Sequence, residues 1–184
     1  FSFLPEIDSE YSFEINNHSF IDMIKKVSIS FSYDVNRPAF NGAYVEILDN
    51  KMRMVSSDTY RLSLSEMDTN IEFQAEAIEP IIIPAKALNE IAKNLFEVDN
   101  IIVNLDSKQI QFEGNDIVFK ARLIKGNFPH YNSVLPEGYR TKIIAETREM
   151  LLAIERATII SLSDERKSSS VICIVDDNNL FINS

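Results

Sequence analysis

A stretch near the start of the chain returns 130 residues later, and this repeat limits the possible folds more than any other feature. Residues 20–34 read FIDMIKKVSISFSYD, and residues 150–164 read MLLAIERATIISLSD. The apolar positions of the two copies coincide, beginning with Phe20 on Met150. The run after the first copy, VEILDNKMRMVSS, also resembles the final run, ICIVDDNNLFINS. The repeat indicates one complete unit of about 125 residues and the opening of a second.

A shorter repeat lies inside the complete unit, where the order strand, helix, strand, strand, strand is predicted twice. Apolar periodicity predicts the first set at 11–15, 20–32, 43–48, 52–56 and 60–67, and the second at 79–84, 85–96, 100–105, 109–113 and 117–124. Residues 49–62 also align with residues 106–119 without a gap, which places Lys51 on Lys108. These patterns predict an α+β fold made of duplicated β-α-β-β-β units.

Composition and the repeat together predict the domain boundaries. Residues 1–10 are expected to be a linker from an upstream domain, and residues 11–133 a complete domain. Residues 134–140 are the predicted interdomain linker, at the end of the run NFPHYNSVLPEGYR, and residues 141–184 the truncated start of a further domain. Because the first residue is Phe1 and not methionine, we expect the chain to be a piece of a longer protein.

The charge balance limits the partners that the chain can have. Lysine and arginine total 18 and aspartate and glutamate total 28, which gives a net charge of −10. This disfavours a simple nonspecific nucleic-acid binder but allows a local basic patch on an acidic body. Cys173, the only cysteine, lies in the apolar run VICIV and is predicted to be buried, which fits a reducing cytoplasm. No apolar run approaches the roughly 20 residues of a membrane-spanning helix, so no membrane partner is expected.

Catalytic and metal sites find little support in the sequence. The two histidines, His18 and His130, stand in no metal-binding spacing, so no metal or cofactor is expected. Asp58 follows two serines, but no nucleophile-elbow pattern surrounds it, and a turn-forming role is favoured. Two alternatives stay open at this stage. One is an α+β enzyme domain with a site around Asp58, Arg61 and His130, and the other is a repeat scaffold with no role on DNA.

The segment MRMVSSDTYRLSL, at residues 52–64, is predicted to be a hairpin with a polar turn. Alternation along its second strand would place Tyr60, Leu62 and Leu64 on one face, with Arg61 and Ser63 on the other. The residues alone leave two interpretations open. Tyr60, Leu62 and Leu64 either close a core while Arg61 is solvated, or the segment forms part of a docking surface for a partner.

Five strings, in order along the chain, resemble the bacterial DNA polymerase III beta subunit family of sliding clamps. They are RPAFNG at 37–42, SSDTYRLSL at 56–64, IIIPAKALNEIAK at 81–93, RLIKGNFPHYNSVLP at 122–136 and LLAIERATIIS at 151–161. The chain departs from the family pattern at Ser57, Tyr60, His130 and Ser133, where the family more often has threonine, histidine, aspartate and a basic residue. These departures concern details of a binding surface and not the fold.

The resemblance implies a DNA-clamp fold with helices on one side and antiparallel sheets on the other. Family members are non-catalytic, cytoplasmic homodimer rings with three similar domains per subunit, and duplex DNA passes through the hole. The ring tethers the replicative polymerase, and a clamp loader and repair proteins bind it through a short apolar and Gln-containing peptide motif. By this resemblance the chain corresponds to the middle domain and the start of the third, and it is not expected to close a ring alone.

The resemblance also assigns residues to two surfaces. A partner-peptide pocket between the middle and third domains is expected to involve Phe40, Ser57, Thr59, Tyr60, Arg61, Leu62, Pro129, Ser133 and Val134. A DNA-facing surface is expected to involve Lys25, Lys26, Arg37, Lys86, Lys93, Arg148 and Arg156, most of them on predicted helices.

Overall fold

The computed structural model describes residues 7–48, 50–69, 71, 78–95, 97–161, 171–176 and 179–183. The chain divides into two compact units, Phe1–Asn132 and Ser133–Ser184, and each is considered by itself. Residues 1–6 of the predicted first linker lie outside the described residues.

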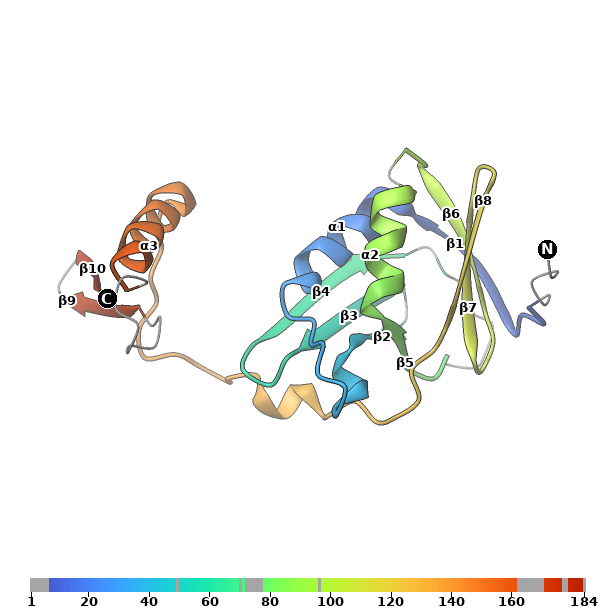
Figure 1. The fold of residues 1–184 in the computed structure, drawn as a ribbon, viewed down its shortest axis with the longest axis horizontal. Coiled ribbons are helices and arrows are strands. Elements are labelled where there is room, and N and C mark those ends of the chain that lie inside the picture. The colour runs from blue at the N-terminus through green and yellow to red at the C-terminus, as the bar shows by residue number, and fades with distance from the viewer. Residues whose placement is uncertain are drawn as a thin grey trace. The chain divides into compact units, whose positions relative to one another are not determined.

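Unit 1 contains the two predicted sets of elements in the expected order (Figure 1). The first set is β1 (Tyr11–Asn16), α1 (Asn17–Ser28), a 3-10 turn η1 (Pro38–Phe40), β2 (Gly42–Leu48), β3 (Lys51–Ser57) and β4 (Leu62–Asp68). The second is β5 (Ile81–Pro84), α2 (Ala85–Asn94), β6 (Asn100–Leu105), β7 (Gln109–Gly114) and β8 (Ile117–Arg122). The α+β fold and its duplicated β-α-β-β-β order are thereby confirmed.

The two halves of unit 1 exchange their first strands. One antiparallel sheet has the order β1-β6-β7-β8, and the other has the order β4-β3-β2-β5. Tyr11 of β1 pairs with Leu105 of β6, and Gly42 of β2 pairs with Pro84 of β5. Each sheet therefore contains one strand from the other half of the sequence, an arrangement that periodicity alone does not specify.

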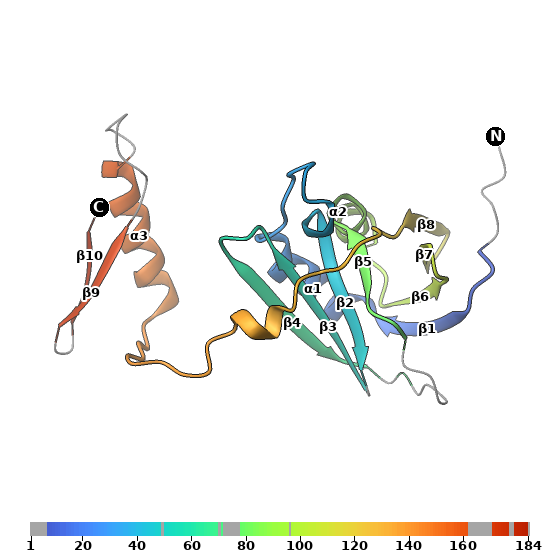
Figure 2. The ribbon, with the colours of Figure 1, turned by 90° about the horizontal axis from the view of Figure 1, so that it is seen from below.

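Helices α1 and α2 lie side by side and pack against the sheets with their apolar faces (Figures 1 and 2). Phe20, Ile24 and Val27 of α1 and Leu88 and Ile91 of α2 are buried. The Phe20 ring stacks on Phe112 of β7 with their centroids 5.6 Å apart. Burying one such side chain contributes about 1.5–3 kcal/mol, so this shared core holds both sheets together.

Two asparagines organise the start of α1, and the second also connects it to the end of α2. The Asn16 side chain caps α1 by accepting a hydrogen bond from the Ser19 N–H at 2.9 Å. The neighbouring Asn17 side chain is buried and donates to the carbonyls of Leu95 and Val98, the latter at 2.8 Å. Asn17 thereby ties the start of α1 to the C-cap of α2 and to the segment just after it.

The hairpin turns of the two halves differ in length, so the ungapped alignment of residues 49–62 with 106–119 is wrong. Four residues, 58–61, connect β3 to β4, whereas Asn115 and Asp116 alone connect β7 to β8. The strand predicted at 60–67 accordingly begins only at Leu62. Tyr60 and Arg61 belong to the turn and have no strand face.

Unit 2 begins within the 3-10 turn η2 (Tyr131–Val134) and contains α3 (Thr147–Ser161), β9 (Ile172–Asp176) and β10 (Asn179–Asn183). The first residue of α3 lies 130 positions after that of α1, as the long repeat predicts. The second copy of that repeat runs on to Asp164, beyond the described part of α3, and the turn between β9 and β10 likewise lies outside the described residues.

The prediction that Cys173 is buried is wrong, because this side chain is exposed on β9. The whole of β9 is exposed, and so is the apolar side chain of Ile159 on α3. Strand β9 pairs with β10 in a sheet of two strands, and α3 contacts β10.

Gly42→Ala should destabilise unit 1 by about 1–3 kcal/mol, the usual cost of overpacking. A Cβ at this position would collide with the backbone carbonyl of Ile83 and lie 3.2 Å from Cδ1 of Ile124. Urea unfolding measures the change. Gly138→Ala is the matched control, because nothing lies within 4 Å of a Cβ there. Equal stabilities of the two variants would contradict the prediction.

Candidate functional site

The turn between β3 and β4 takes its shape from hydrogen bonds within residues 57–61. Oδ1 of Asp58 accepts from the backbone N–H groups of Tyr60 and Arg61, both at 3.0 Å, and Oδ2 accepts from Nε of Arg61 at 2.9 Å. Ser57 Oγ donates to the Arg61 carbonyl at 2.9 Å. These bonds explain the Asp58 and Ser57 positions as turn-forming, which is the role the sequence favours for Asp58.

The Asp58 carboxylate is therefore stabilised in its charged form. The backbone N–H of Arg61 contributes most to lowering the pKa of Asp58, followed by the Tyr60 N–H and the Arg61 guanidinium. Both carboxylate oxygens are already engaged by donors of the same turn. This arrangement suits a structural anion and leaves no oxygen without a donor to act as a base.

Thr59 adopts a left-handed backbone conformation with φ of 78°. A β-branched residue in this region is strained, usually by about 1–2 kcal/mol. The turn between β7 and β8 places Asn115 in the same region, with φ of 49°, and asparagine tolerates it far better. The hydrogen bonds of Asp58 hold Thr59 in a conformation that its own side chain disfavours.

The side chains of the turn and of the start of β4 point to solvent to different degrees. Tyr60 is 96% exposed, so its side chain does not close a core as one interpretation of the sequence proposes. Arg61 is exposed and paired with Asp58, and Leu62 is half-buried. The prediction that Tyr60 and Leu62 share a strand face is wrong, because Tyr60 precedes β4.

A row of four aromatic rings connects η1 with the segment that follows β8. Phe40 packs against Phe128 with their ring centroids 5.6 Å apart, Phe128 stacks on Tyr44 at 5.1 Å, and Tyr44 meets Tyr131 edge-on at 6.1 Å. Phe128 and Tyr131 lie just before the linker predicted at 134–140, and both pack against Tyr44 of β2. Of the four residues, only Phe40 is among the predicted site residues.

Three charged side chains form a ladder across β2, β3 and β4. Glu46 is opposite Arg53, which is opposite Glu66. Nε of Arg53 donates to Oε1 of Glu66 at 2.6 Å, and Nη1 of Arg53 donates to the Tyr131 hydroxyl at 2.8 Å. The Tyr131 hydroxyl donates in turn to Oε2 of Glu46 at 2.5 Å.

This environment shifts the ionisation of both donors so that they keep their protons. The hydrogen bond to Tyr131 contributes most to raising the pKa of Arg53, with that to Glu66 next. Burial, followed by the hydrogen bond to Glu46, raises the pKa of Tyr131. At neutral pH the phenol is therefore a hydrogen-bond donor, held between an acidic and a basic side chain.

The sequence did not single out Tyr44, Glu46, Arg53, Phe128 or Tyr131. Two signals for this cluster exist in hindsight. Tyr44 and Glu46 alternate with buried residues on β2, so they share its outer face. Phe128 and Tyr131 are three residues apart in a segment otherwise rich in turn formers, which is unusual for a solvated linker.

The remaining predicted peptide-binding residues lie beside Tyr131 in the sequence. Pro129 is exposed, between the packed Phe128 and the buried Tyr131. Ser133 and Val134 are exposed in η2, and Val134 is 68% exposed. Within this short segment, Phe128 and Tyr131 pack on β2, whereas the residues around them face solvent.

The lysines of α1 and α2 lie on the faces turned away from the core. Together the two helices carry four lysines and two carboxylates, a net charge of +2 on a chain of net charge −10. Lys26 pairs with Asp22 at 2.6 Å and Lys93 with Glu90 at 3.3 Å. Lys25 and Lys86 are exposed and make no ion pair within the described part of unit 1.

The other predicted basic residues are exposed as well. Arg37 precedes η1, where its backbone N–H donates to the Asp34 carbonyl at 3.1 Å. Arg148 and Arg156 are exposed on α3 in unit 2.

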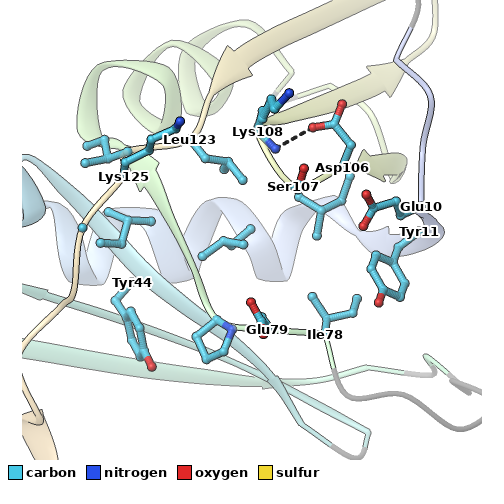
Figure 3. A pocket seen from close by; sticks show the side chains of 16 residues that line it. Glu10, Tyr11, Tyr44, Ile78, Glu79, Asp106, Ser107, Lys108, Leu123 and Lys125 are labelled. Carbon is cyan, nitrogen blue, oxygen red and sulfur yellow. Dashed lines mark hydrogen bonds between the residues drawn. The ribbon is translucent and has the colours of Figure 1, made fainter.

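A groove of about 820 Å³ opens beside β5 and the turn between β6 and β7 (Figure 3). Its walls carry both carboxylates and lysines, and Asp106 is already bound by the backbone N–H of Lys108 at 2.7 Å. None of the predicted site residues lines this groove, and its mixed charges define no ligand class.

Neither a metal site nor a membrane helix emerges from the residues that the structure describes. Within these residues, no three side chains of the His, Cys, Asp or Glu type gather where they could hold a metal ion. None of the described helices is long and apolar enough to cross a membrane.

Comparison with solved structures identifies the fold class as that of sliding clamps. A DnaN sliding clamp (DNA polymerase III subunit beta) from Pseudomonas aeruginosa, bound to griselimycin, superposes with a TM-score of 0.89 at 24% identity, over 99% of this chain and 48% of that one. A DnaN sliding clamp from Bartonella birtlesii, also bound to griselimycin, gives a TM-score of 0.84 at 26% identity, over 97% of this chain and 48% of the other.

Sequence comparison places the chain in a family. Residues 14–130 match the family described as DNA polymerase III beta subunit, central domain. The beta sliding clamp of Rickettsia bellii is 32% identical over 90% of this chain and 44% of its own length, and that of Bacillus subtilis is 25% identical over 86% and 42%. The chain belongs to the DNA polymerase III beta subunit family, and it spans less than half the length of these relatives.

Thr59→Asn should stabilise unit 1 by about 0.5–1 kcal/mol, because asparagine relieves part of the left-handed strain. The reverse change in the other hairpin, Asn115→Thr, should destabilise unit 1 by a comparable amount, since it introduces the same strain. Thermal unfolding of both variants measures the effect. Shifts of the same sign for the two variants would rule out strain at Thr59.

Acidification should weaken the turn at residues 57–61. The folded pKa of Asp58 lies below its ordinary value of 3.8, so its hydrogen bonds stabilise the turn above pH 3.8 and are lost as the pH falls through the folded pKa. An NMR titration of the Tyr60 and Arg61 amide signals should show a midpoint below 3.8. Asp58→Asn should abolish that titration, and a midpoint above 3.8 in the unaltered chain would contradict the assignment.

Proposed function

We propose that this chain is part of a processivity clamp of bacterial DNA replication. As part of a ring it would encircle duplex DNA and tether the replicative polymerase. The observation that carries this proposal is the match to the central-domain family over residues 14–130, together with a clamp fold along nearly the whole chain. A net positive helix face on an acidic chain supports it, because a clamp must surround DNA without reading its sequence.

On the DNA side, the proposed contacts are electrostatic. Lys25, Lys26, Lys86 and Lys93 of the helices would attract phosphates weakly enough for the ring to slide. Arg37, Arg148 and Arg156 are proposed as further contributors. The excess of carboxylates elsewhere on the chain would repel DNA from other surfaces, which favours passage along one face.

On the partner side, we propose a peptide-binding surface centred on the turn between β3 and β4. Phe40 and Leu62 would offer apolar contacts, while Ser57, Thr59, Tyr60 and Arg61 would shape the rim. Pro129, Ser133 and Val134 would continue the same surface. Its proposed ligands are the apolar and Gln-containing peptides of polymerase, clamp loader and repair proteins. That two clamps of this fold carry bound griselimycin supports a ligand-binding surface in the family.

The proposed protein is non-catalytic, needs no cofactor and acts in the cytoplasm. The enzyme alternative around Asp58, Arg61 and His130 loses support, because Asp58 and Arg61 are committed to each other within the turn. Unit 2 is proposed to be the opening of a third clamp domain, which its exposed apolar side chains and its repeat of α1 support. The chain alone is proposed not to close the homodimer ring.

A synthetic peptide of the Gln-Leu-x-Leu-Phe type, with alanine at x, should shift the NMR amide signals of residues 57–62 in the labelled chain. Leu62→Ala should weaken binding at least about fivefold, because apolar anchors carry most of the affinity of such peptides. Ile102→Ala, which alters an exposed apolar residue on β6, is the matched control. Absence of any shift at residues 57–62 would refute the proposed surface.

Reversing the charge of lysines on α1 and α2 should show whether this helix face contacts DNA. In a full-length protein that contains this chain, Lys25→Glu with Lys86→Glu should shorten the lifetime of the loaded ring on circular DNA about tenfold at low salt. Lys108→Glu with Lys125→Glu, two exposed lysines outside the helices, carries the same charge change and should have little effect. Equal losses for the two sets would contradict a DNA-facing helix layer.

A further inference from the structure

We propose that Tyr131 is a positioning residue for the peptide-binding surface. Together with Glu46 and Arg53 it forms what we call the Tyr131 anchor, which fixes the segment after β8 onto the outer face of β2 and β3. This inference rests on the proposed function, because the segment fixed in this way carries Pro129 and leads into Ser133 and Val134, the first residues of unit 2. In this role Tyr131 does not touch the peptide but determines where its neighbours stand.

The anchor is specific because the hydroxyl of Tyr131 serves two partners at once. It donates to Oε2 of Glu46 at 2.5 Å and accepts from Nη1 of Arg53 at 2.8 Å. The Tyr131 residue is only 4% exposed, and the side chains of Glu46 and Arg53 are 18% and 26% exposed. Hydrogen bonds to charged groups in such shielded positions are stronger than those on an open surface.

Arg53 is itself held in place from the opposite side. Its Nη2 lies 2.5 Å from Oε1 of Glu66, while its Nη1 reaches Tyr131. The planar guanidinium can bridge both partners because its donors form a rigid fork, which a lysine cannot reproduce. The position of Tyr131 is thus tied to three adjacent strands through one side chain.

Packing places the anchored segment in one orientation. Phe128 stacks on Tyr44 with their centroids 5.1 Å apart, and Tyr131 meets the same Tyr44 ring at 6.1 Å. The exposed Pro129 lies between these two packed residues, so it must face away from β2. Tyr131 is also the first residue of η2, the turn that carries Ser133 and Val134. Fixing Tyr131 therefore fixes the start of that turn.

The anchor explains why the outer face of β2 and β3 carries a polar cluster and not apolar residues alone. Apolar residues on the outer face of β2 and β3 would hold a linker by packing alone, but they would not specify its register. A hydroxyl between a carboxylate and a guanidinium selects one position along the strands, since any slip leaves a charged group without its partner.

Tyr131→Phe tests the anchor, because it removes the hydroxyl and retains the ring. Amide hydrogen exchange of the 184-residue chain should accelerate about tenfold at residues 128–134, with no change at residues 58–61 or in α1. Affinity for the same Gln-Leu-x-Leu-Phe peptide should fall severalfold. Tyr139→Phe removes an exposed phenol and is the matched control.

A double-mutant cycle separates positioning from general stabilisation. Arg53→Lys should loosen the same residues, and combining it with Tyr131→Phe should add little further acceleration, because both changes break one shared hydrogen bond. Additive effects of the two changes would indicate independent structural roles and would overturn the anchor. Acceleration spread over the whole of unit 1 would overturn it equally.

The outcomes also distinguish the anchor from the proposed function. Local acceleration with weaker peptide binding supports both. Local acceleration with unchanged affinity overturns the positioning role, and unchanged exchange overturns the anchor itself. If the unaltered chain binds no peptide, the proposed surface fails, while the exchange data still decide whether Tyr131 fixes the segment.

Discussion

Neither half of unit 1 can build its sheet alone, because β1 pairs with β6 and β5 pairs with β2. This exchange of first strands makes the duplicated sequence a single cooperative unit. The sheet of β4, β3 and β2 lacks its outer strand β5 until the second half is present, and the other sheet likewise needs β1 from the first half. The exchange also brings α1 and α2 side by side, where both helices pack on one core and the Asn17 side chain donates to the Leu95 carbonyl at the end of α2. The layer of lysine-bearing helices and the sheets that support the turn at residues 58–61 all depend on these two strand pairings.

The outer face of the β4-β3-β2-β5 sheet, turned away from the core, holds another part of the chain. Its residues alternate with the buried core of β2 and β3, so they are available to hold the chain where it leaves unit 1. Phe128 and Tyr131 occupy that face and hold the last residues of unit 1 against β2. Two surfaces of different chemistry result, a helix face that is net positive and a sheet face organised by aromatic rings and paired charges.

Much of this arrangement could be predicted from the sequence. Periodicity located the strands and both helices of unit 1, and the long repeat located α3, because local apolar patterns reflect burial directly. The strand exchange could not be predicted in this way, since pairing between distant strands leaves no local pattern. Turn lengths were missed for a similar reason: a four-residue turn and a two-residue turn both read as short polar runs. The roles of Arg53 and Tyr131 depend on partners 78 residues apart, which one sequence cannot reveal.

The turn at residues 57–61 has a consequence for how such a chain can change over generations. Its backbone is set by Asp58, the Ser57 hydroxyl and main-chain groups, so the side chains at positions 59 and 60 contribute nothing to closing it. Tyr60 in particular extends almost wholly into solvent. Substitution at that position can therefore alter the surface that the turn presents while the fold stays intact. If the proposed peptide surface includes this turn, that surface can drift with its ligands, and the residues beneath it need not change in step.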